Sequence, residues 1–209
     1  LNEQGNIGKV IHNIRQLHPK VKVYVSDDGS SDQTQAIARG AGAIVIDRTH
    51  RKIKGITASV VEALQYVDTK KVVIMDGDLQ HPPDKVQEMI QALDNADLVI
   101  AVREKIIGPW GFFRKLESKI ATSLAKMRLG HEIEDPLSGF FGLRKTAISD
   151  ISLDKFEMRC FKILFNILKS LDLRKKRIGY VYYNFDIRKN GKSKIRTKHI
   201  YYFIRNLLK

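Results

Sequence analysis

The sequence contains almost no cysteine and no long apolar run. Its one cysteine, Cys160, excludes a framework of internal disulfides and fits a reducing compartment or a fold that needs no covalent cross-link. No stretch reaches the roughly 18 consecutive apolar residues of a bilayer-spanning helix, and no secretory-type signal opens the sequence. The 209 residues, of which 43% are hydrophobic and 29% charged, suffice for a buried core and exclude a disordered tail.

Acidic residues are scarce relative to basic ones. The sequence has 37 Lys and Arg residues against 23 Asp and Glu residues, which gives a formal net charge of +14. Residues 1–100 are close to balance, so residues 101–209 carry most of the surplus. Such a surplus predicts an anionic partner: nucleic acid, an acidic membrane or a phosphorylated substrate. A basic nucleic-acid-binding domain is therefore one alternative, although no RRM, KH or helix-turn-helix pattern is present.

Short apolar strands alternate with helices in the first half of the sequence. The expected strands are 21–26, 43–46, 71–75 and 97–102. The expected helices are 6–17, about ten residues capped by Asp32, 56–67 and 84–94. This alternation predicts an α/β fold with a mostly parallel sheet covered by helices. In such sheets, ligands bind at the carboxyl ends of the strands.

The rhythm changes after residue 103. We expect a helix over 110–129, a loop at 135–141 that leads into a strand, an apolar helix over 160–171, a β segment over 177–188 and an amphipathic helix over 197–209. No repeat and no low-complexity linker separates these segments from the first half. We therefore expect residues 1–209 to form a single domain, of a size typical of catalytic domains.

Two carboxylates follow the apolar strand in "VVIMDGDLQHPP" (72–83). Asp76 and Asp78 lie two residues apart, and Gln80 adds a neutral oxygen, so the three can share a hard cation such as Mg²⁺ or Mn²⁺. A turn that uses Asp and Gly for backbone reasons is the alternative. A second acidic loop, "DDGSSD" (27–32), ends a neighbouring strand and can present Asp28 to a nucleoside, with Ser30 and Asp32 capping the next helix.

Five segments occur in the order and spacing of one known group: "NEQGNI", "VSDDGSSDQT", "MDGDLQHPP", "DPLSGFFGLRK" and "RKNGKSK". The sequence resembles the inverting GT-A glycosyltransferases of family 2 and, within them, the dolichyl-phosphate (polyprenyl-phosphate) mannose synthases. The resemblance implies a GT-A (Rossmann-like) fold and mannose transfer from GDP-mannose to dolichyl or polyprenyl phosphate. In that family a first strand precedes the match to "NE", so we expect this sequence to begin at the family's second element.

The resemblance also implies roles for single residues on the donor side of the reaction. The nucleotide sugar is expected to contact Glu3, Asp28, Lys54 and Asp76. The metal ion, Mg²⁺ or Mn²⁺, is expected to bind Asp76, Asp78 and Gln80. For Lys54 a solvated surface charge is the alternative. His81, placed before two prolines, is expected to be structural, and Cys160 is expected to be a small core residue.

On the acceptor side, the resemblance assigns the phosphates to Arg103, Arg114, Ser118, Arg188 and Lys194. A solvated surface charge is the alternative for Arg103, Arg188 and Lys194. Asp76, Asp78 and Arg103 form the expected catalytic set. Asp135 and Ser138 either shape the acceptor loop or only close a turn on Gly139. A phosphate monoester is largely dianionic near neutrality, so it needs little help from a general base. The reaction then depends on cations around the two phosphates, which gives the basic second half a purpose.

A lipid acceptor also predicts contact with a membrane surface. Trp110, Phe112 and Phe113 stand beside Arg114 and Lys115, a combination that suits the headgroup boundary. The terminal helix carries an apolar stripe of Ile200, Phe203, Ile204, Leu207 and Leu208. Core packing is the alternative for both stretches. We therefore expect 110–129 and 197–209 to be membrane-surface helices at the cytoplasmic face.

Two further functions stay open at this point. One keeps the fold and transfers glucose or another sugar to polyprenyl phosphate from UDP-glucose or a similar donor, because base selectivity is not readable from these residues. The other is an inactive scaffold, which would follow from an incomplete nucleotide pocket. Nucleic acid is not the expected partner, because the acidic loops would repel phosphate in the absence of a metal ion.

Overall fold

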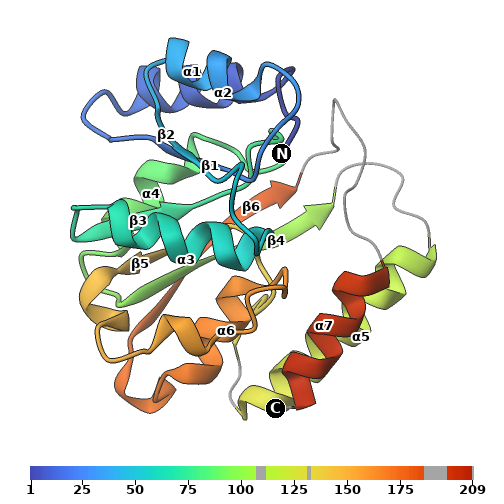
Figure 1. The fold of residues 1–209 in the computed structure, drawn as a ribbon. Helices are drawn as coiled ribbons and strands as arrows, with labels where there is room; N and C mark the ends of the chain where they lie inside the picture. Colours follow the sequence, from blue (N-terminus) through green and yellow to red (C-terminus); the bar gives the residue numbers. More distant parts are fainter. Residues whose placement is uncertain (107–111, 131–132, 186–196, 209) are drawn as a thin grey trace.

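The computed structural model describes residues 1–106, 112–130, 133–185 and 197–208, without the side chains of 106, 112–117 and 197–199. Two sheets and seven α-helices make up this part of the chain (Figure 1). Because the strands are short and the helices intervene between most of them, the chain has the α/β character expected from its pattern.

The smaller sheet is formed by residues from the start of the chain. Strand β1 (Tyr24–Asp27) pairs in parallel with β2 (Ile44–Asp47). Helices α1 (Ile7–Leu17) and α2 (Thr34–Gly40) contact each other beside this sheet. Apolar residues of both helices form a separate core cluster, whose buried members are Ile7 and Ile11 of α1, Ala38 of α2, and Ala43.

The larger sheet has the strand order β3-β5-β4-β6. Strand β4 (Leu98–Ile106) pairs in parallel with β6 (Ile178–Phe185), whereas β5 (Phe141–Arg144) is antiparallel to β4 and to β3 (Lys71–Ile74). Strands β3, β4 and β6 thus point the same way, which confirms the mostly parallel prediction. The exception is β5, whose direction the sequence analysis did not predict.

Helices cover both faces of this larger sheet because β4 is apolar on both of its sides. Leu98 and Ile100 pack in one core cluster with residues of α3 (Ile56–Tyr66) and α6 (Ile163–Ser170). Val99 and Ala101 pack in another cluster with residues of α4 (Lys85–Ala92). The alternation of β4 side chains therefore decides which helices lie on which face.

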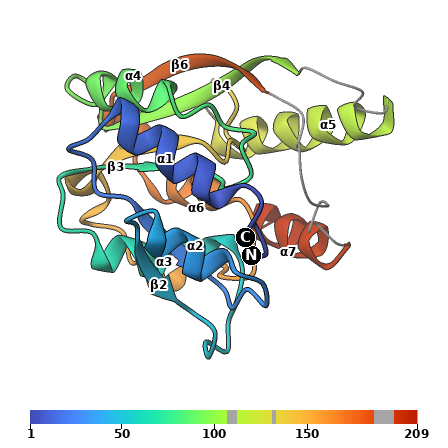
Figure 2. The same ribbon diagram turned by 90° about the horizontal axis from the view of Figure 1, so that it is seen from above.

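Helices α5 (Phe112–Leu129) and α7 (Thr197–Leu208) contact each other and lie to one side of the sheet, away from α1 and α2 (Figures 1 and 2). Three short 3₁₀ helices complete the described elements: η1 (Lys145–Ile148), η2 (Leu153–Lys155) and η3 (Leu173–Lys175). In the described part of the chain, no helix is both long enough and apolar enough to cross a membrane.

The start of α2 corrects one expectation. The helix has seven residues rather than about ten, and its N-cap residue is Gln33 rather than Asp32. Asp32 still serves the helix, because its Oδ1 accepts the backbone N–H of Thr34 at 3.0 Å. Ser30 does not cap this helix: its backbone N–H donates to Asp27 Oδ1 at 2.7 Å, which closes a tight turn.

Candidate active site

The polar residues at the end of β3, in β4 and before β5 meet at one edge of the larger sheet. Ile74, the last residue of β3, is opposite Phe141, the first residue of β5, and Phe141 is also opposite Ile100. Because β5 is antiparallel, the segment that enters it reaches the edge where β3 ends. The antiparallel strand therefore brings residues 135–140 to the loop of Asp76 and Asp78.

A buried histidine fixes the start of the acidic loop. The backbone N–H of Asp76 donates to His81 Nδ1 at 3.0 Å. The His81 ring stacks on Phe140 with centroids 5.2 Å apart, and Tyr183 and Phe185 contact its edge. Burial lowers the pKa of His81 more than the charges of Asp76 and Asp78 raise it, so the ring stays neutral and Nδ1 can accept. This is the structural role expected for His81.

The two carboxylates of the loop differ in exposure. Asp78 is buried, and its Oδ1 accepts the backbone N–H of Gln80 at 3.1 Å. The side chain of Asp76 is 47% exposed. Leu79, between the two hydrogen-bonded residues, has a φ of +65°, which turns the chain sharply after Asp78. The loop thus places one carboxylate inside the edge and the other at its surface.

Gly139 allows the segment before β5 to approach Asp76 closely. A Cβ at this position would lie 3.2 Å from Asp76 Oδ2 and 3.3 Å from His81 Cε1.

The acidic loop offers two carboxylates and, from Gln80, one amide, all hard oxygen donors that suit Mg²⁺ or Mn²⁺. The described residues hold no group of three or more His, Cys, Asp or Glu side chains able to bind a metal. An ion held by Asp76 and Asp78 would thus share its shell with substrate oxygens.

Arg103 of β4 is paired with Asp135. The guanidinium donates from Nε to Asp135 Oδ2 at 2.7 Å and from Nη2 to Oδ1 at 2.9 Å, and it lies over the Phe185 ring at 5.7 Å. Burial opposes the charge of Arg103, but the hydrogen bond and charge of Asp135 together raise its pKa, so it is a permanent cation. Asp135 therefore positions Arg103.

Ser138 closes the turn before β5. Its hydroxyl donates to the backbone oxygen of Ala101 at 2.8 Å and accepts the N–H of Phe140 at 3.2 Å. The side chain is buried. The geometry thus matches the turn-closing alternative for Ser138, whereas Asp135 belongs to the charged edge.

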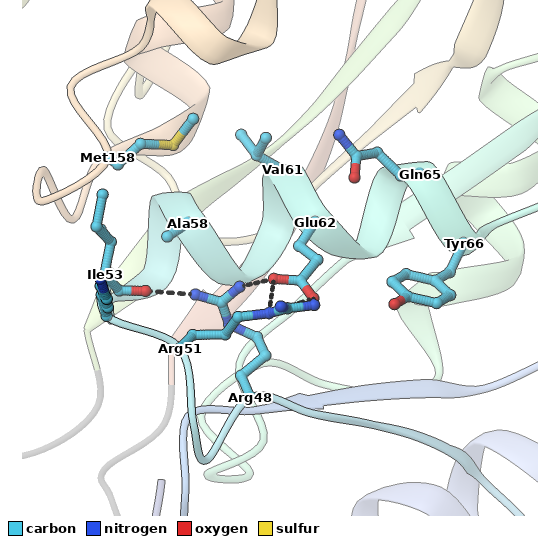
Figure 3. Close-up of a pocket in the computed structure, with 10 residues that line it drawn as sticks. Arg48, Arg51, Ile53, Ala58, Val61, Glu62, Gln65, Tyr66 and Met158 are labelled. Carbon is cyan, nitrogen blue, oxygen red and sulfur yellow. Dashed lines mark hydrogen bonds and ion pairs between the residues drawn. The ribbon is translucent and has the colours of Figure 1, made fainter.

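Asp28 at the end of β1 is held by two protein donors. Its Oδ1 accepts from Arg48 Nε at 2.7 Å, and its Oδ2 accepts the backbone N–H of Gly55 at 2.6 Å. Arg48 is 2% exposed and also donates to the backbone oxygen of Ile53 at 2.8 Å and to Glu62 (Figure 3). A nucleoside would therefore meet a carboxylate whose position is already fixed, through its remaining lone pairs.

The other two residues expected at the nucleotide lie near the same strand end. The ammonium of Lys54 lies 3.1 Å from where a Cβ of Gly29 would be, so it is next to the turn that follows Asp28. The backbone N–H of Glu3 donates to Thr34 Oγ1 at 2.7 Å, and its Oε2 accepts from the Asn6 side chain at 2.7 Å. The structure thus brings Asp28 and Lys54 together and fixes Glu3 between the starts of α1 and α2.

A cavity of about 550 Å³ lies beside Arg48. It is lined by the loop after β2 and by α3, with Arg48, Arg51, Glu62 and Tyr66 among its walls and Met158 at one side (Figure 3). None of the predicted site residues that the structure describes lines this cavity. The cavity adjoins the predicted site through Arg48, which lines it and also binds Asp28.

Most residues expected at the acceptor phosphate lie where side chains are not described. Arg188 and Lys194 lie outside the described residues, as does Trp110. Arg114, Phe112, Phe113 and Lys115 belong to α5, but their side chains are not described. Ser118 lies on the same helix and is half-buried. The acceptor assignments of these residues stay predictions.

Lys162, just before α6, is a residue of this edge that the sequence analysis missed. Its ammonium donates to the backbone oxygen of Leu137 at 2.9 Å and lies 5.0 Å from the centre of the Phe161 ring. Burial, and then the charge of Arg103, lower the pKa of Lys162 to about 8, against the opposing charges of Asp135 and Asp76. The available signal was a single lysine inside an otherwise apolar segment, "CFKILFNIL".

Arg48 was missed for a similar reason. It directly follows β2, at the same strand edge as Asp28, but the hydrogen bond joins residues 20 positions apart. An arginine placed immediately after a short apolar strand was the signal. Its three partners, Asp28, Glu62 and Ile53, come from three different segments, and no local pattern connects them.

Helices α5 and α7 each expose apolar side chains, and we call these side chains together the α5–α7 face. Its exposed side chains are Ile120, Leu124, Met127, Ile200, Tyr201, Ile204 and Leu208. The stripe predicted for the terminal helix is divided: Phe203 is buried against Phe165 and Cys160, and Leu207 packs at the edge of the same cluster. Phe203 is therefore a core residue, and Cys160 is buried as expected.

The chain matches known proteins over most of its length. The family "Glycosyl transferase family 2" matches residues 1–152. A dolichol-phosphate mannosyltransferase of Pyrococcus furiosus is 33% identical, over 99% of this chain and 60% of that protein. A dolichol-phosphate mannosyltransferase of Saccharomyces cerevisiae is 30% identical, over 87% of this chain and 70% of that protein. The chain thus spans about two thirds of the length of these curated relatives.

A solved structure shows the same fold. Glucosyl-3-phosphoglycerate synthase from Mycobacterium tuberculosis, in complex with Mn²⁺, UDP-glucose and phosphoglyceric acid, superposes with a TM-score of 0.70. The two sequences are 21% identical, and the match covers 99% of this chain and 76% of that one. The likeness confirms the predicted GT-A fold.

Proposed function

The chain belongs to glycosyl transferase family 2, and we propose that it transfers mannose from GDP-mannose to the phosphate of a dolichyl or polyprenyl lipid. The names of the archaeal and yeast relatives support mannose transfer to dolichol phosphate, and GDP-mannose as the donor is part of the proposal. The observation that carries the proposal is the sheet edge itself, where the Asp76–Gln80 loop meets the Arg103–Asp135 pair. The nucleic-acid alternative has no support from the family.

The proposed chemistry is a single displacement with inversion. An oxygen of the lipid phosphate bonds to the anomeric carbon of mannose, and the bond from that carbon to the diphosphate breaks. The nucleoside diphosphate leaves with the electron pair, so no proton needs to move in this step. The phosphate nucleophile is already anionic, and for that reason we assign no residue as a general base.

The donor side is proposed to use the acidic loop and the end of β1. Asp76, Asp78 and Gln80 would hold Mg²⁺ or Mn²⁺, which neutralises charge on the leaving diphosphate when it is bound. Asp28, fixed by Arg48 and Gly55, would contact the base or ribose, with Lys54 and Glu3 at its sides. The half-exposed Asp76 is placed to meet either the ion or the ribose.

The acceptor side is proposed to use the cations beyond β4. Arg103, held by Asp135 in a fixed orientation, would contact a phosphate oxygen, which a planar guanidinium does well. Arg114, Ser118, Arg188 and Lys194 are proposed to complete the phosphate site. Positive charges around the incoming phosphate reduce its repulsion from the diphosphate that is leaving.

The enzyme is proposed to work at a membrane surface, on its cytoplasmic face. The acceptor lipid is insoluble in water, and the α5–α7 face exposes Met127, Ile204, Leu208 and further apolar side chains. Contact of such a face with the headgroup region removes apolar surface from water. Basic residues nearby add roughly 1 kcal/mol each at an anionic surface.

The experiment is a donor panel with one soluble acceptor. The chain is incubated with Mn²⁺, a short-chain polyprenyl phosphate and either GDP-mannose or UDP-glucose, and the glycolipid and the released nucleoside diphosphate are measured. We expect mannolipid and GDP, formed only when the lipid phosphate is present. Glucolipid and UDP in place of these products would assign the other donor, and no glycolipid from either would contradict the proposal.

A further inference from the structure

We propose that Lys162 is a phosphate-binding residue of the transfer edge, which acts with Arg103 on a phosphate group of the donor or the acceptor. This inference rests on the proposed sugar transfer between two phosphate esters. The relevant observation is that Arg103 on β4 and Lys162 just before α6 both contact the short segment 135–139.

The segment 135–139 connects three groups of the site. Asp135 binds the Arg103 guanidinium, Leu137 accepts a hydrogen bond from Lys162, and Gly139 packs against the Asp76 carboxylate. The contact of Lys162 therefore lies between the two contacts that fix Arg103 and Asp76. Any phosphate that bridges Arg103 and an ion at Asp76 would approach this segment.

The positive charge of Lys162 is not needed for its hydrogen bond to the backbone oxygen of Leu137. Lys162 is half-buried and donates to a neutral carbonyl, and no ion pair of Lys162 is found among the described residues. Its neighbour Arg103 is ion-paired with Asp135, so of these two cations Arg103 alone has an ion-pair partner among the described residues. Placing the half-buried ammonium of Lys162 next to the Arg103 guanidinium costs free energy. A neutral N–H donor would hold the Leu137 carbonyl equally well. An anionic phosphate explains why the position carries a charge.

The electrostatic environment agrees with this reading. The charge of Arg103 is the second largest cause that lowers the pKa of Lys162 to about 8, so the two side chains are near each other. Below that pH the amine is mainly protonated, and near neutrality Lys162 is a cation. A phosphate that binds both side chains would relieve their repulsion, which is an interaction that strengthens binding.

Three variants separate the effect of the Lys162 charge from the effect of its hydrogen bond to Leu137. Lys162→Gln removes the charge and keeps a neutral N–H donor on a side chain one bond shorter, and Lys162→Arg keeps the charge. Lys145→Met is the matched control, because Lys145 also donates from its ammonium to a single backbone oxygen, that of Val67 at 2.6 Å. Lys145 follows β5 at the end where Arg144 is opposite Lys71, which is the edge remote from Asp76.

Binding of GDP with Mn²⁺ and of a short-chain polyprenyl phosphate is measured by calorimetry, together with KM for both substrates. A hydrogen bond to a charged group is worth about 1.5–3 kcal/mol, so Lys162→Gln should weaken one ligand roughly 10- to 100-fold. Weaker lipid binding places Lys162 at the acceptor phosphate, and weaker GDP binding places it at the leaving diphosphate. Lys162→Arg should recover most of the loss, and Lys145→Met should stay within about two-fold.

Unchanged affinity of folded Lys162→Gln for both ligands overturns the inference, because the neutral donor then suffices. If the glutamine variant does not fold, the arginine variant decides, since weak binding despite a retained charge contradicts the proposal. Wild-type protein that makes no glycolipid would refute the proposed function instead. Lys162 would then be judged by the two binding affinities alone, with the same outcomes.

Discussion

Arg48 and Arg103 are both largely buried, but the charges around them are balanced differently. Arg48 contacts two carboxylates, those of Asp28 and Glu62, and Glu62 also pairs with Arg51, so two cations are matched by two anions. At the transfer edge, Arg103 is ion-paired with Asp135, whereas Lys162 donates to the backbone oxygen of Leu137. The first group, which we call the paired cluster, is complete within the protein. At the transfer edge the Lys162 ammonium has no ion pair among the described residues, and an anionic substrate would supply one.

The difference indicates that the two regions serve different ends. Removing one partner of a buried pair leaves an uncompensated charge, so the paired cluster should dominate stability. At the transfer edge, removing a cation relieves repulsion in the free protein, and the loss should appear in activity. Substitutions that keep shape and remove charge test this division most directly.

The largest effect is expected for Asp78→Asn at the transfer edge. The change keeps the size of a buried side chain but removes the anionic charge that would hold the metal ion. Turnover at saturating Mn²⁺ should fall by roughly 100- to 1,000-fold, as is typical when one electrostatic group of a transition state is lost. Asp84→Asn, at the exposed N-cap position of α4, is the control and should keep wild-type turnover. Wild-type turnover of Asp78→Asn would remove Asp78 from the site.

Arg48→Met should produce the largest loss of stability. It leaves Asp28 without its ion-pair partner and Glu62 with only the more exposed Arg51, in a cluster where Arg48 is 2% exposed. We expect the free energy of unfolding to fall by about 3–5 kcal/mol. Chemical denaturation at pH 7 measures the change. A loss below about 1 kcal/mol would show that the paired cluster is not a stability element.

Arg103→Met should show the opposite pattern. Asp135 loses its partner, but Lys162 is relieved of a neighbouring cation, so the loss of stability should be less than half of that for Arg48→Met. Glycolipid formation should fall roughly 100-fold, because the phosphate loses a guanidinium. If Arg103→Met unfolds as readily as Arg48→Met while the remaining folded protein is fully active, the division between the two regions is wrong.

Ile204→Glu tests the membrane side of the transfer region. Ile204 is 50% exposed on α7, and a charge there should weaken binding to anionic vesicles by roughly ten-fold with little change in stability. Ile44→Glu is the matched control, since Ile44 is 49% exposed on β2, far from the α5–α7 face. Sedimentation with vesicles measures both. Equal losses for the two variants would argue against a specific face.

The smallest effect concerns pH and Lys162. Its pKa is lowered to about 8 in the folded protein from 10.5 in the unfolded chain, so the unfolded state binds more protons between these values. The difference in unfolding free energy between wild type and Lys162→Gln should therefore move in favour of wild type as the pH rises from 7.5 to 10. Denaturant unfolding at both values measures it. A constant difference would show that the amine is not destabilised in the fold.

Much of the fold could be predicted from the sequence because local patterns decide it. The strands and helices of the first half follow from apolar runs and helical spacing, and β4 needs helices on both faces because its first five residues, 98–102, are all apolar. The direction of β5 could not be predicted in this way, because it depends on which strands it joins. For the apolar stripe that contains Phe203, membrane contact and core packing both stayed open, since helical spacing alone does not say which side of α7 meets Cys160 and Phe165.

The candidate site divides in the same way. Asp28, Asp76, Asp78 and Gln80 are recognisable because they sit at strand ends within short motifs. Arg48 and Lys162 are not, because each acts through partners distant in the chain: 20 residues separate Arg48 from Asp28, and 25 separate Lys162 from Leu137. The two missed cations are the residues on which the contrast between the paired cluster and the transfer edge depends.

The central claim is that the loop after β3 holds a divalent ion against the nucleotide diphosphate. Crystals grown with GDP and Mn²⁺, with diffraction measured at the manganese absorption edge, test it directly. The account predicts an anomalous peak within coordinating distance of Asp78 and of the GDP phosphates. A peak elsewhere, or GDP bound away from residues 76–80, would contradict it.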